Sequence, residues 1–276
     1  MAKRKETIVT ADDAVHALSK RFTSFHRHST YQVFSDFLTL AACALSNAID
    51  RSGFDVREQT YLETIKRYSK DEAAVFPELL ALVVQAFEPM PGEVIYRDVL
   101  GELFMTLELG NQWAGQYFTP YCIALMMAMM TVGDADTLRA SLEPRGFLRA
   151  AEPAVGGGAM VIALADAFKS AGVNYQEHLH VTCYDIDIKA VHMAYIQLSL
   201  LHVPAVVIHG NTISGECWGE WRTPAHVLGL WDVKLRRAQA DDEAVQEVVE
   251  TTEVSDMVVV ERPPVTPGMP SQLVLF

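Results

Sequence analysis

Residues 152–159 have the residue types and spacing of a ligand-binding loop. They read Glu-Pro-Ala-Val-Gly-Gly-Gly-Ala, follow a short apolar run at 147–151 and precede a helical pattern at 160–168. Gly156 and Gly158 lack a Cβ, so the backbone can turn sharply and a bulky ligand can rest on main-chain N–H groups at the helix N-terminus. This pattern alone is weak, because a bare glycine turn in a doubly wound domain has the same sequence.

Three further segments lie at ordered distances from this loop. Upstream, residues 115–120 read Gly-Gln-Tyr-Phe-Thr-Pro and open an apolar helical pattern. Downstream, an expected strand at 181–184 ends in Asp-Ile-Asp from Asp185, about the spacing at which an acidic residue closes the second strand of a nucleotide-binding βαβ unit and binds the ribose hydroxyls. A third expected strand, at 205–208, ends in a Gly-Asn-Thr-Ile segment that contains Asn211.

Read in order, the four segments resemble the adenine-N6 DNA methyltransferases found as modification subunits of type I restriction-modification systems. That family typically has G-Q-F/Y-F/Y-T-P, then D-P-A-C-G-S-G-G, then an acidic residue followed by I-D, then G-D/N-T-L. The resemblance covers roughly residues 98–213, includes the Asp-Val-Leu-Gly-Glu-Leu-Phe lead-in at 98–104, and is specific as a set. It implies S-adenosyl-L-methionine as the cofactor and DNA as a partner.

The resemblance assigns residues of all four segments to the cofactor, namely Tyr117, Phe118, Thr119, Pro120, Glu152, Pro153, Gly156, Gly158, Asp185, Ile186 and Asn211. By that likeness, the first four hold the methionine end and the glycines lie beneath it. Asp185 binds the ribose, Ile186 packs on the adenine ring, and Asn211 meets the adenine amino edge. Glu152 stands where the family usually has Asp, which keeps the carboxylate.

The catalytic motif of that family is missing. N6-methylation needs Asn or Asp followed by Pro-Pro-aromatic, because an amide oxygen and a neighbouring carbonyl accept the adenine amino hydrogens while the aromatic ring stacks on the flipped base. The nearest segments are 231–235, which begins like the family's fourth strand, and 256–265, where Arg262 takes the Asn position and Val265 the aromatic position. Arginine has only donors and valine has no ring. The catalytic residues therefore remain unassigned.

Two functions stay open. The first is an S-adenosylmethionine-binding protein of the DNA adenine-N6 methyltransferase family that acts on or near DNA, with impaired or absent catalysis or with an acceptor site supplied by a separate specificity or catalytic subunit. The second is a non-catalytic regulatory or anti-restriction protein on a methyltransferase fold, associated with DNA or with the replication clamp.

The C-terminal residues carry a second signal. Residues 263–270 hold four prolines, which predict an extended tether. The final residues Gln272, Leu273, Leu275 and Phe276 resemble the peptide that binds the bacterial DNA polymerase sliding clamp, commonly Q-L-S/D-L-F. Such a segment can lay Leu and Phe anchors into preformed apolar pockets. The alternative is a last edge strand that packs on the chain's own sheet.

Composition indicates a cytoplasmic protein with no membrane partner. The N-terminus lacks the apolar core of a signal peptide, and the longest apolar stretch, near 37–45, is expected to be too short to span a bilayer. The four cysteines show no C-x-x-C spacing and are expected to be reduced core thiols. No metal site is expected, since the pair of histidines at His178 and His180 is more typical of a strand end.

We expect an α/β fold of three parts: an N-terminal helical domain at 1–110, a Rossmann-like S-adenosylmethionine-dependent methyltransferase core at 111–262, and a Pro-rich flexible tail at 263–276. The helical stripes include Leu18 and Phe22, Phe34 and Phe37, and a third stripe from Phe76. The net charge of −13 argues against coating DNA by bulk attraction. Residues 241–276 hold eight acidic side chains and one basic one, and 241–254 is either an acidic helix or a disordered stretch.

Overall fold

The computed structural model of the chain describes residues 11–87, 97–109, 119–143, 145–255 and 272–274. Their centre is a five-stranded sheet in the order β4-β3-β2-β1-β5. Its strands are β1 (Leu148–Glu152), β2 (Leu179–Asp185), β3 (Ala205–Asn211), β4 (Glu216–Arg222) and β5 (Gln272–Val274). All neighbouring pairs are parallel except β3 with β4. The three strands expected from the apolar runs are thus confirmed, and the fold is α/β and Rossmann-like.

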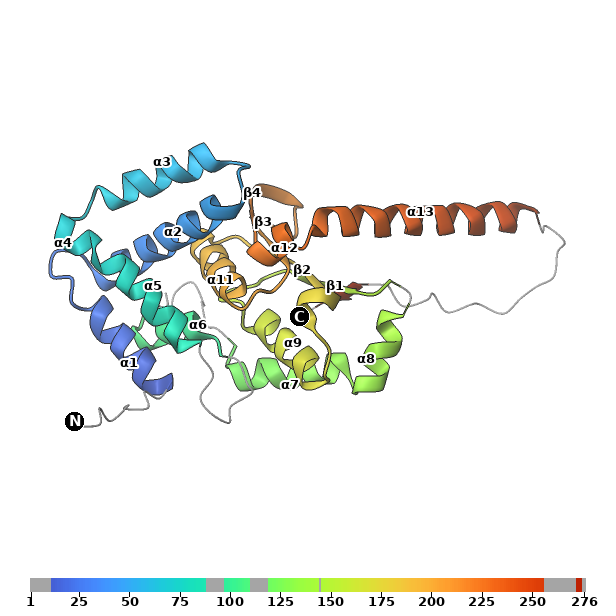
Figure 1. Cartoon of the computed structure of the whole chain (residues 1–276), viewed down its shortest axis with the longest axis horizontal. Helices are drawn as coiled ribbons and strands as arrows, with labels where there is room; N and C mark the ends of the chain where they lie inside the picture. The colour runs from blue at the N-terminus through green and yellow to red at the C-terminus, as the bar shows by residue number, and fades with distance from the viewer. Residues whose placement is uncertain (1–10, 88–96, 110–118, 144, 256–271, 275–276) are drawn as a thin grey trace, which may run out of the picture.

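Two crossover helices connect the parallel strands. α9 (Ala159–Ser170) and the short α10 (Tyr175–His178) lie between β1 and β2, and α11 (Ile188–Leu200) lies between β2 and β3. Both crossovers run in the same direction along the sheet, so right-handed connections place α9 and α11 on one face, in front of the strands in Figure 1. β5 lies on the other side of β1, so the direction in which successive strands are added to the sheet reverses between β1 and β5. Ligands of such sheets usually bind next to this point.

The N-terminal part is helical, as expected. It comprises α1 (Ala11–Phe22), α2 (Thr30–Ile49), α3 (Phe54–Ile65), α4 (Lys70–Ala73), α5 (Val75–Ala86) and α6 (Val99–Thr106). The apolar stripes meet in its interior, where the Phe22 ring lies edge-on to Phe37 with 5.3 Å between centroids. Because α2 packs along α11, one continuous hydrophobic core extends from these helices into the sheet.

The apolar stretch near 37–45 is part of a longer helix than expected. α2 has 20 residues and is apolar enough to meet the criteria for a membrane span, so the expectation that the stretch is too short is wrong for the helix as a whole. The pair α7 (Tyr121–Val132) and α8 (Ala135–Leu142), bent by 62°, meets the same criteria together. However, 56% of the apolar window of α2 is buried inside the protein, and a core helix of a soluble protein passes the same test.

α7 exposes its large apolar side chains and buries its small ones. Ala124 and Ala128 are fully buried, whereas Met126, Met129 and Met130 are 53 to 77% exposed. The physical reason is the packing of α7 on α9: small residues allow the two helices to approach closely, and the bulky ones point outward. Two cysteines depart from the expected core position, since Cys122 and Cys217 are exposed while Cys43 and Cys183 are buried.

Beyond β4, the chain forms α12 (Pro224–Leu228) and the long helix α13 (Trp231–Ser255), which extends away from the body (Figure 1). The interpretation of 231–235 as a relic of a fourth strand is therefore wrong, and 241–254 is helical. Trp231, fully buried, anchors the start of α13 edge-on to Phe147, 5.1 Å between centroids. Asp242 adds ion pairs with Arg145 and Arg149.

β5 comes from the segment for which clamp binding is predicted. The backbone of Gln272–Val274 pairs in parallel with β1, so that Leu273 lies opposite Ala150. This is the arrangement of the edge-strand alternative. Leu275, Phe276 and the tether at 256–271 lie outside the described residues. Binding to a second protein is not tested by this pairing, and the clamp interpretation stays a prediction.

Candidate functional site

The carboxyl ends of β1, β2 and β3 bring three predicted site residues to one edge of the sheet. Glu152 ends β1, Asp185 ends β2 and Asn211 ends β3. Because the strands are parallel, with Glu152 opposite Cys183 and Asp185 opposite His209, the loops that follow them are neighbours. Ligands of open α/β sheets bind outside this edge.

The glycine loop after β1 is held by backbone contacts to its neighbours. The Val155 N–H donates to the carbonyl of Tyr184 at 2.8 Å, and the Thr212 hydroxyl donates to the carbonyl of Pro153 at 2.7 Å. Gly156 has φ +53° and Gly158 has φ +101°, backbone conformations that strongly favour glycine. Gly158 is also the N-cap of α9. The predicted strand, glycine turn and helix are confirmed in this geometry.

Asp185 ties the second strand to this loop. Its Oδ2 accepts a hydrogen bond from the Gly156 N–H and its Oδ1 accepts one from the Asp187 N–H, both at 2.9 Å. Burial raises the pKa of the Asp185 carboxyl, and these N–H groups oppose that rise. Each carboxylate oxygen can accept a second hydrogen bond. Asp185 can therefore position the loop and still accept from a ligand hydroxyl.

Glu152 is a buried carboxyl beneath the same loop, 1% exposed. Its Oε1 accepts from the Ala154 N–H at 3.1 Å, while its buried Oε2 has no hydrogen-bond partner in the described part of the chain. Burial raises the pKa of Glu152 to about 7, the Ala154 N–H lowers it and the charge of Asp185 raises it further. A carboxyl of this kind changes protonation near neutral pH.

Ile186 and Asn211 differ in what they can offer a ligand. The Ile186 side chain is 67% exposed at the edge of the sheet, so it is available to cover a flat ring. The Oδ1 of Asn211 accepts from the Ile213 N–H at 3.0 Å and the Ser214 N–H at 3.4 Å. Asn211 therefore retains its Nδ2 donor for a ring nitrogen, and its oxygen is already engaged rather than open to an adenine amino group.

Sequence reasoning missed a buried contact between α6 and the glycine loop. The Gln197 side chain, fully buried on α11, donates from Nε2 to Asp98 Oδ1 and to the Gly157 carbonyl, both at 2.6 Å. Its Oε1 accepts from the Leu100 N–H at 3.0 Å. In the sequence, the Asp-Val-Leu-Gly segment at 98–101 stands out only through the family resemblance, and no local pattern marks Gln197.

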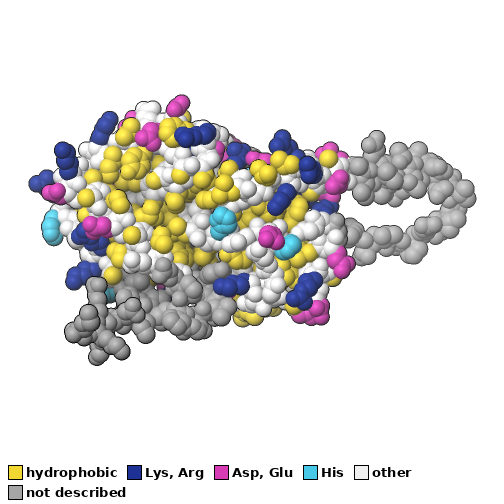
Figure 2. Space-filling model, in the orientation of Figure 1, with side chains coloured by type: hydrophobic (Ala, Val, Ile, Leu, Met, Phe, Trp, Pro, Cys, Tyr) yellow, Lys and Arg dark blue, Asp and Glu magenta, His cyan; other side chains and the backbone are white. Residues whose placement is uncertain are grey.

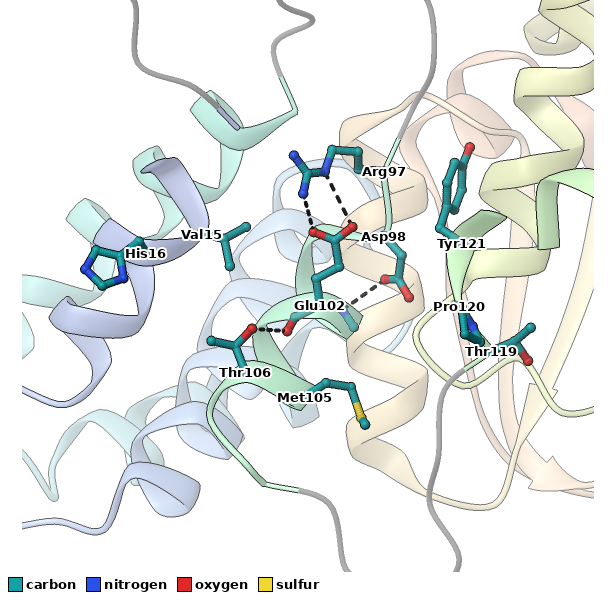
Figure 3. A pocket seen from close by; sticks show the side chains of 11 residues that line it. Val15, His16, Arg97, Asp98, Glu102, Met105, Thr106, Thr119, Pro120 and Tyr121 are labelled. Atoms are coloured by element: carbon teal, nitrogen blue, oxygen red, sulfur yellow. Dashed lines mark hydrogen bonds and ion pairs between the residues drawn. The ribbon is translucent and has the colours of Figure 1, made fainter. Parts of the chain in front are cut away.

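A cavity of about 520 Å³ lies beside this contact (Figure 3). Its walls come from three helices: residues of α1, residues at the start of α6, and the first turn of α7. Thr119 and Pro120 line it together with Asp98 and Glu102. The structure thus places the Thr-Pro pair and the glycine loop on two sides of Asp98. The other two residues of that predicted segment, Tyr117 and Phe118, lie outside the described residues.

His178, just before β2, and His180, within β2, have separate partners. His178 contacts the Gly146 carbonyl through Nδ1 at 2.6 Å, whereas His180 lies 2.9 Å from His226 between ring nitrogens. Burial lowers the pKa of His180 to about 3, which keeps that ring neutral. Within the described ranges, no group of three or more His, Cys, Asp or Glu side chains is placed to hold a metal ion.

Comparison with solved structures finds similarity at low sequence identity. A crystal structure from Listeria monocytogenes, provisionally assigned to the class I S-adenosylmethionine-dependent methyltransferases, is 11% identical in sequence, with a TM-score of 0.42. The match covers 74% of this chain and 55% of that one, so the chain matches about half of that protein's length. No protein-family model and no curated protein sequence matches the chain.

Proposed function

We propose that the chain binds S-adenosylmethionine at the carboxyl edge of β1, β2 and β3 and that it is a member of the DNA adenine-N6 methyltransferase group acting on or near DNA, with impaired or absent catalysis. One observation carries this proposal. The glycine loop, Asp185 and the Thr119-Pro120 turn are far apart in the sequence, yet they gather around one edge of the sheet and one adjoining cavity.

The side chains at this edge fit such a ligand. Asp185 offers acceptor capacity for ribose hydroxyls, Ile186 an exposed apolar surface for the adenine ring, and Asn211 a free donor for a ring nitrogen. Glu152 adds a buried carboxyl oxygen without a partner among the described residues. S-adenosylmethionine, when bound, supplies an electrophilic methyl group on a sulfonium. The chain's own residues bind and orient the ligand and exclude water from the edge of the sheet.

The described residues show no site that could hold the adenine to be methylated. Since 231–235 is the start of a helix, it supplies no strand and loop for an adenine pocket, and 256–265 lies outside the described residues. Asn211 cannot replace the missing motif, because its oxygen is engaged by two N–H groups. We therefore propose that methyl transfer to adenine requires a separate subunit if it occurs at all.

We propose that the chain contacts DNA over a small area only, or that a partner protein makes the contact. The net charge is −13, and Figure 2 shows the Lys and Arg side chains dispersed among acidic and apolar ones on the face that it draws. Nonspecific DNA binding depends on clustered phosphate contacts from basic side chains. The described side chains therefore do not form a continuous basic surface on this face (Figure 2).

A second candidate function is a non-catalytic regulatory or anti-restriction protein associated with the sliding clamp. It is supported by the missing acceptor tetrapeptide together with the Q-L-V-L-F sequence at 272–276. Both candidates share the S-adenosylmethionine site and differ in methyl transfer.

A pair of variants in one loop tests the cofactor site. Asp185→Ala removes the ribose acceptor and should weaken S-adenosylmethionine binding by about 1.5–3 kcal/mol, measured by calorimetry. Asp187→Ala, two residues further, removes the helix cap and its ion pair with Lys189 at 2.9 Å, and serves as the matched control. Both variants should first be compared with the wild type for their melting temperatures. Equal binding by Asp185→Ala and the wild type would contradict the proposed role of Asp185.

A further inference from the structure

The Asp98 carboxylate occupies a space that two glycines leave open. It is 3% exposed and caps α6 by accepting from the Gly101 N–H at 2.9 Å. A Cβ at Gly101 would lie 2.0 Å from Oδ2, and a Cβ at Gly157 would lie 3.3 Å from the same oxygen. The carboxylate therefore touches both the first turn of α6 and the glycine loop after β1, and a larger residue at either position would displace it.

Only one of the two carboxylate oxygens is satisfied within the described chain. Oδ1 accepts from the Gly101 N–H and from Gln197 Nε2. No donor among the described residues reaches Oδ2. Burial raises the pKa of Asp98, and the nearby charge of Glu102 raises it further. The carboxylate lines the cavity wall while most of its side chain is buried, and a cation placed against it would offset the cost of burying its charge.

The cavity of about 520 Å³ gives such a cation access to Asp98 (Figure 3). The second carboxylate in its wall, Glu102, is already held by Arg97 at 2.6 Å. Opposite stands the Thr119-Pro120 turn at the start of α7. Asp98 is thus the carboxylate left for a ligand, placed between that turn and Gly157.

We propose that Asp98 binds the α-ammonium group of the ligand's amino-acid end. This inference rests on the proposed function, in which the glycine loop and the Thr119-Pro120 turn flank the methionine end of S-adenosylmethionine. An ammonium group is positively charged and has three donors, so it can form a charge-assisted hydrogen bond to the Asp98 Oδ2 atom in the cavity wall. The contact selects ligands that carry an amino acid over nucleosides that lack one.

The test compares three ligands on two proteins. S-adenosylhomocysteine carries the ammonium, its desamino analogue lacks only that group, and 5′-methylthioadenosine lacks the whole amino-acid end. The variant Asp98→Asn keeps the shape of the side chain and the oxygen that caps α6 and accepts from Gln197. Calorimetry should show wild-type affinity roughly 10- to 100-fold higher for S-adenosylhomocysteine than for the desamino analogue, a preference that Asp98→Asn abolishes.

The control variant is Glu102→Gln, which removes a charge from the same cavity wall but from a carboxylate paired with Arg97. It should retain the preference for the ammonium. Asp98→Asn should bind 5′-methylthioadenosine within about threefold of the wild type, since that ligand makes no contact through an ammonium.

The outcomes separate this inference from the proposed function. Wild-type protein that binds neither S-adenosylhomocysteine nor 5′-methylthioadenosine would overturn both. Wild-type protein that binds S-adenosylhomocysteine and its desamino analogue equally would overturn the role of Asp98 and leave the cofactor site standing, and this comparison needs no variant to fold. A uniform loss of all three ligands in Asp98→Asn would make Asp98 a structural residue of the loop.

Discussion

Glu152→Gln should stabilise the protein at alkaline pH. The substitution keeps the size of the side chain and an oxygen that can accept from the Ala154 N–H, but it removes the group that ionises. In the wild type, burial raises the pKa of this carboxyl from 4.5 to about 7. The folded protein therefore holds the proton more tightly than the unfolded chain, and ionisation of Glu152 opposes folding.

The magnitude follows from the difference between these two pKa values. Below the unfolded pKa of 4.5, Glu152 costs the wild type no stability, because the carboxyl is protonated in both states. The free energy of unfolding then falls as the pH rises from 4.5 to about 7, and the loss is nearly complete above that pH. Each unit of difference is worth about 1.4 kcal/mol, so the full loss is about 3.5 kcal/mol. Relative to the wild type, Glu152→Gln should therefore gain about 3 kcal/mol at pH 8 and about 1 kcal/mol or less at pH 5.

Urea denaturation at pH 5 and pH 8 measures this gain directly, because other titrating groups are shared by both proteins and cancel in the difference. The matched control is Glu177→Gln, an exposed residue of α10, which should change the free energy of unfolding little at either pH. A Glu152→Gln protein that is destabilised by the same amount at both pH values would refute the reasoning. Such a result would mean that the carboxyl is needed for its hydrogen bonds and is not ionised in the folded state.

Two other predictions concern transfer and the tail. The isolated chain should transfer little or no labelled methyl from S-adenosylmethionine to adenine-rich DNA, because its sequence has no Asn/Asp-Pro-Pro-aromatic tetrapeptide to accept the adenine amino hydrogens. Robust transfer by this chain alone would show that it has another acceptor site. A peptide of residues 263–276 should bind a bacterial sliding clamp, and Leu275→Ala with Phe276→Ala should reduce that binding below detection, since losing two apolar anchors at roughly 1.5–3 kcal/mol each weakens a micromolar contact by two or more orders of magnitude. If the peptide ignores the clamp and the full-length double variant melts well below the wild type, the segment serves as an edge strand on β1.

The sheet and its loops could be predicted because their signals are local. Apolar runs of strand length, a glycine turn before a helical pattern and an acidic residue after the second strand each fit within a few residues. Parallel pairing then brings Glu152 and Asp185 to the same edge without further information. The same applies to the buried stripes of α1 and α2.

The contacts that complete the site could not be predicted, because they join distant segments. Asp98 and Gln197 are 99 residues apart, and neither has a neighbour in sequence that signals the pairing. The exposure of the methionines of α7 could not be predicted for a related reason. An apolar helix has no single obvious buried face, and the choice of its alanine face depends on α9, which lies further along the chain.

The long helix α13 could not be predicted from the similarity of residues 231–235 to a strand of the family. Trp231 begins a run that resembles the start of a strand, but the following residues, rich in Lys, Arg, Gln and Ala, have high helix propensity. Burial of Trp231 against Phe147 is satisfied equally by the first turn of a helix. Helix propensity therefore determines that this segment is a helix, and the contact of Trp231 with Phe147 determines where the helix packs.

A calorimetric titration of the wild-type chain with S-adenosylmethionine tests the central claim most directly. We expect one saturable site, for which S-adenosylhomocysteine competes, and a melting temperature that rises with the logarithm of the excess ligand concentration. No heat of binding and no shift in melting temperature at millimolar ligand would contradict it, because the edge of the sheet would then hold its glycine loop and carboxylates without binding this cofactor.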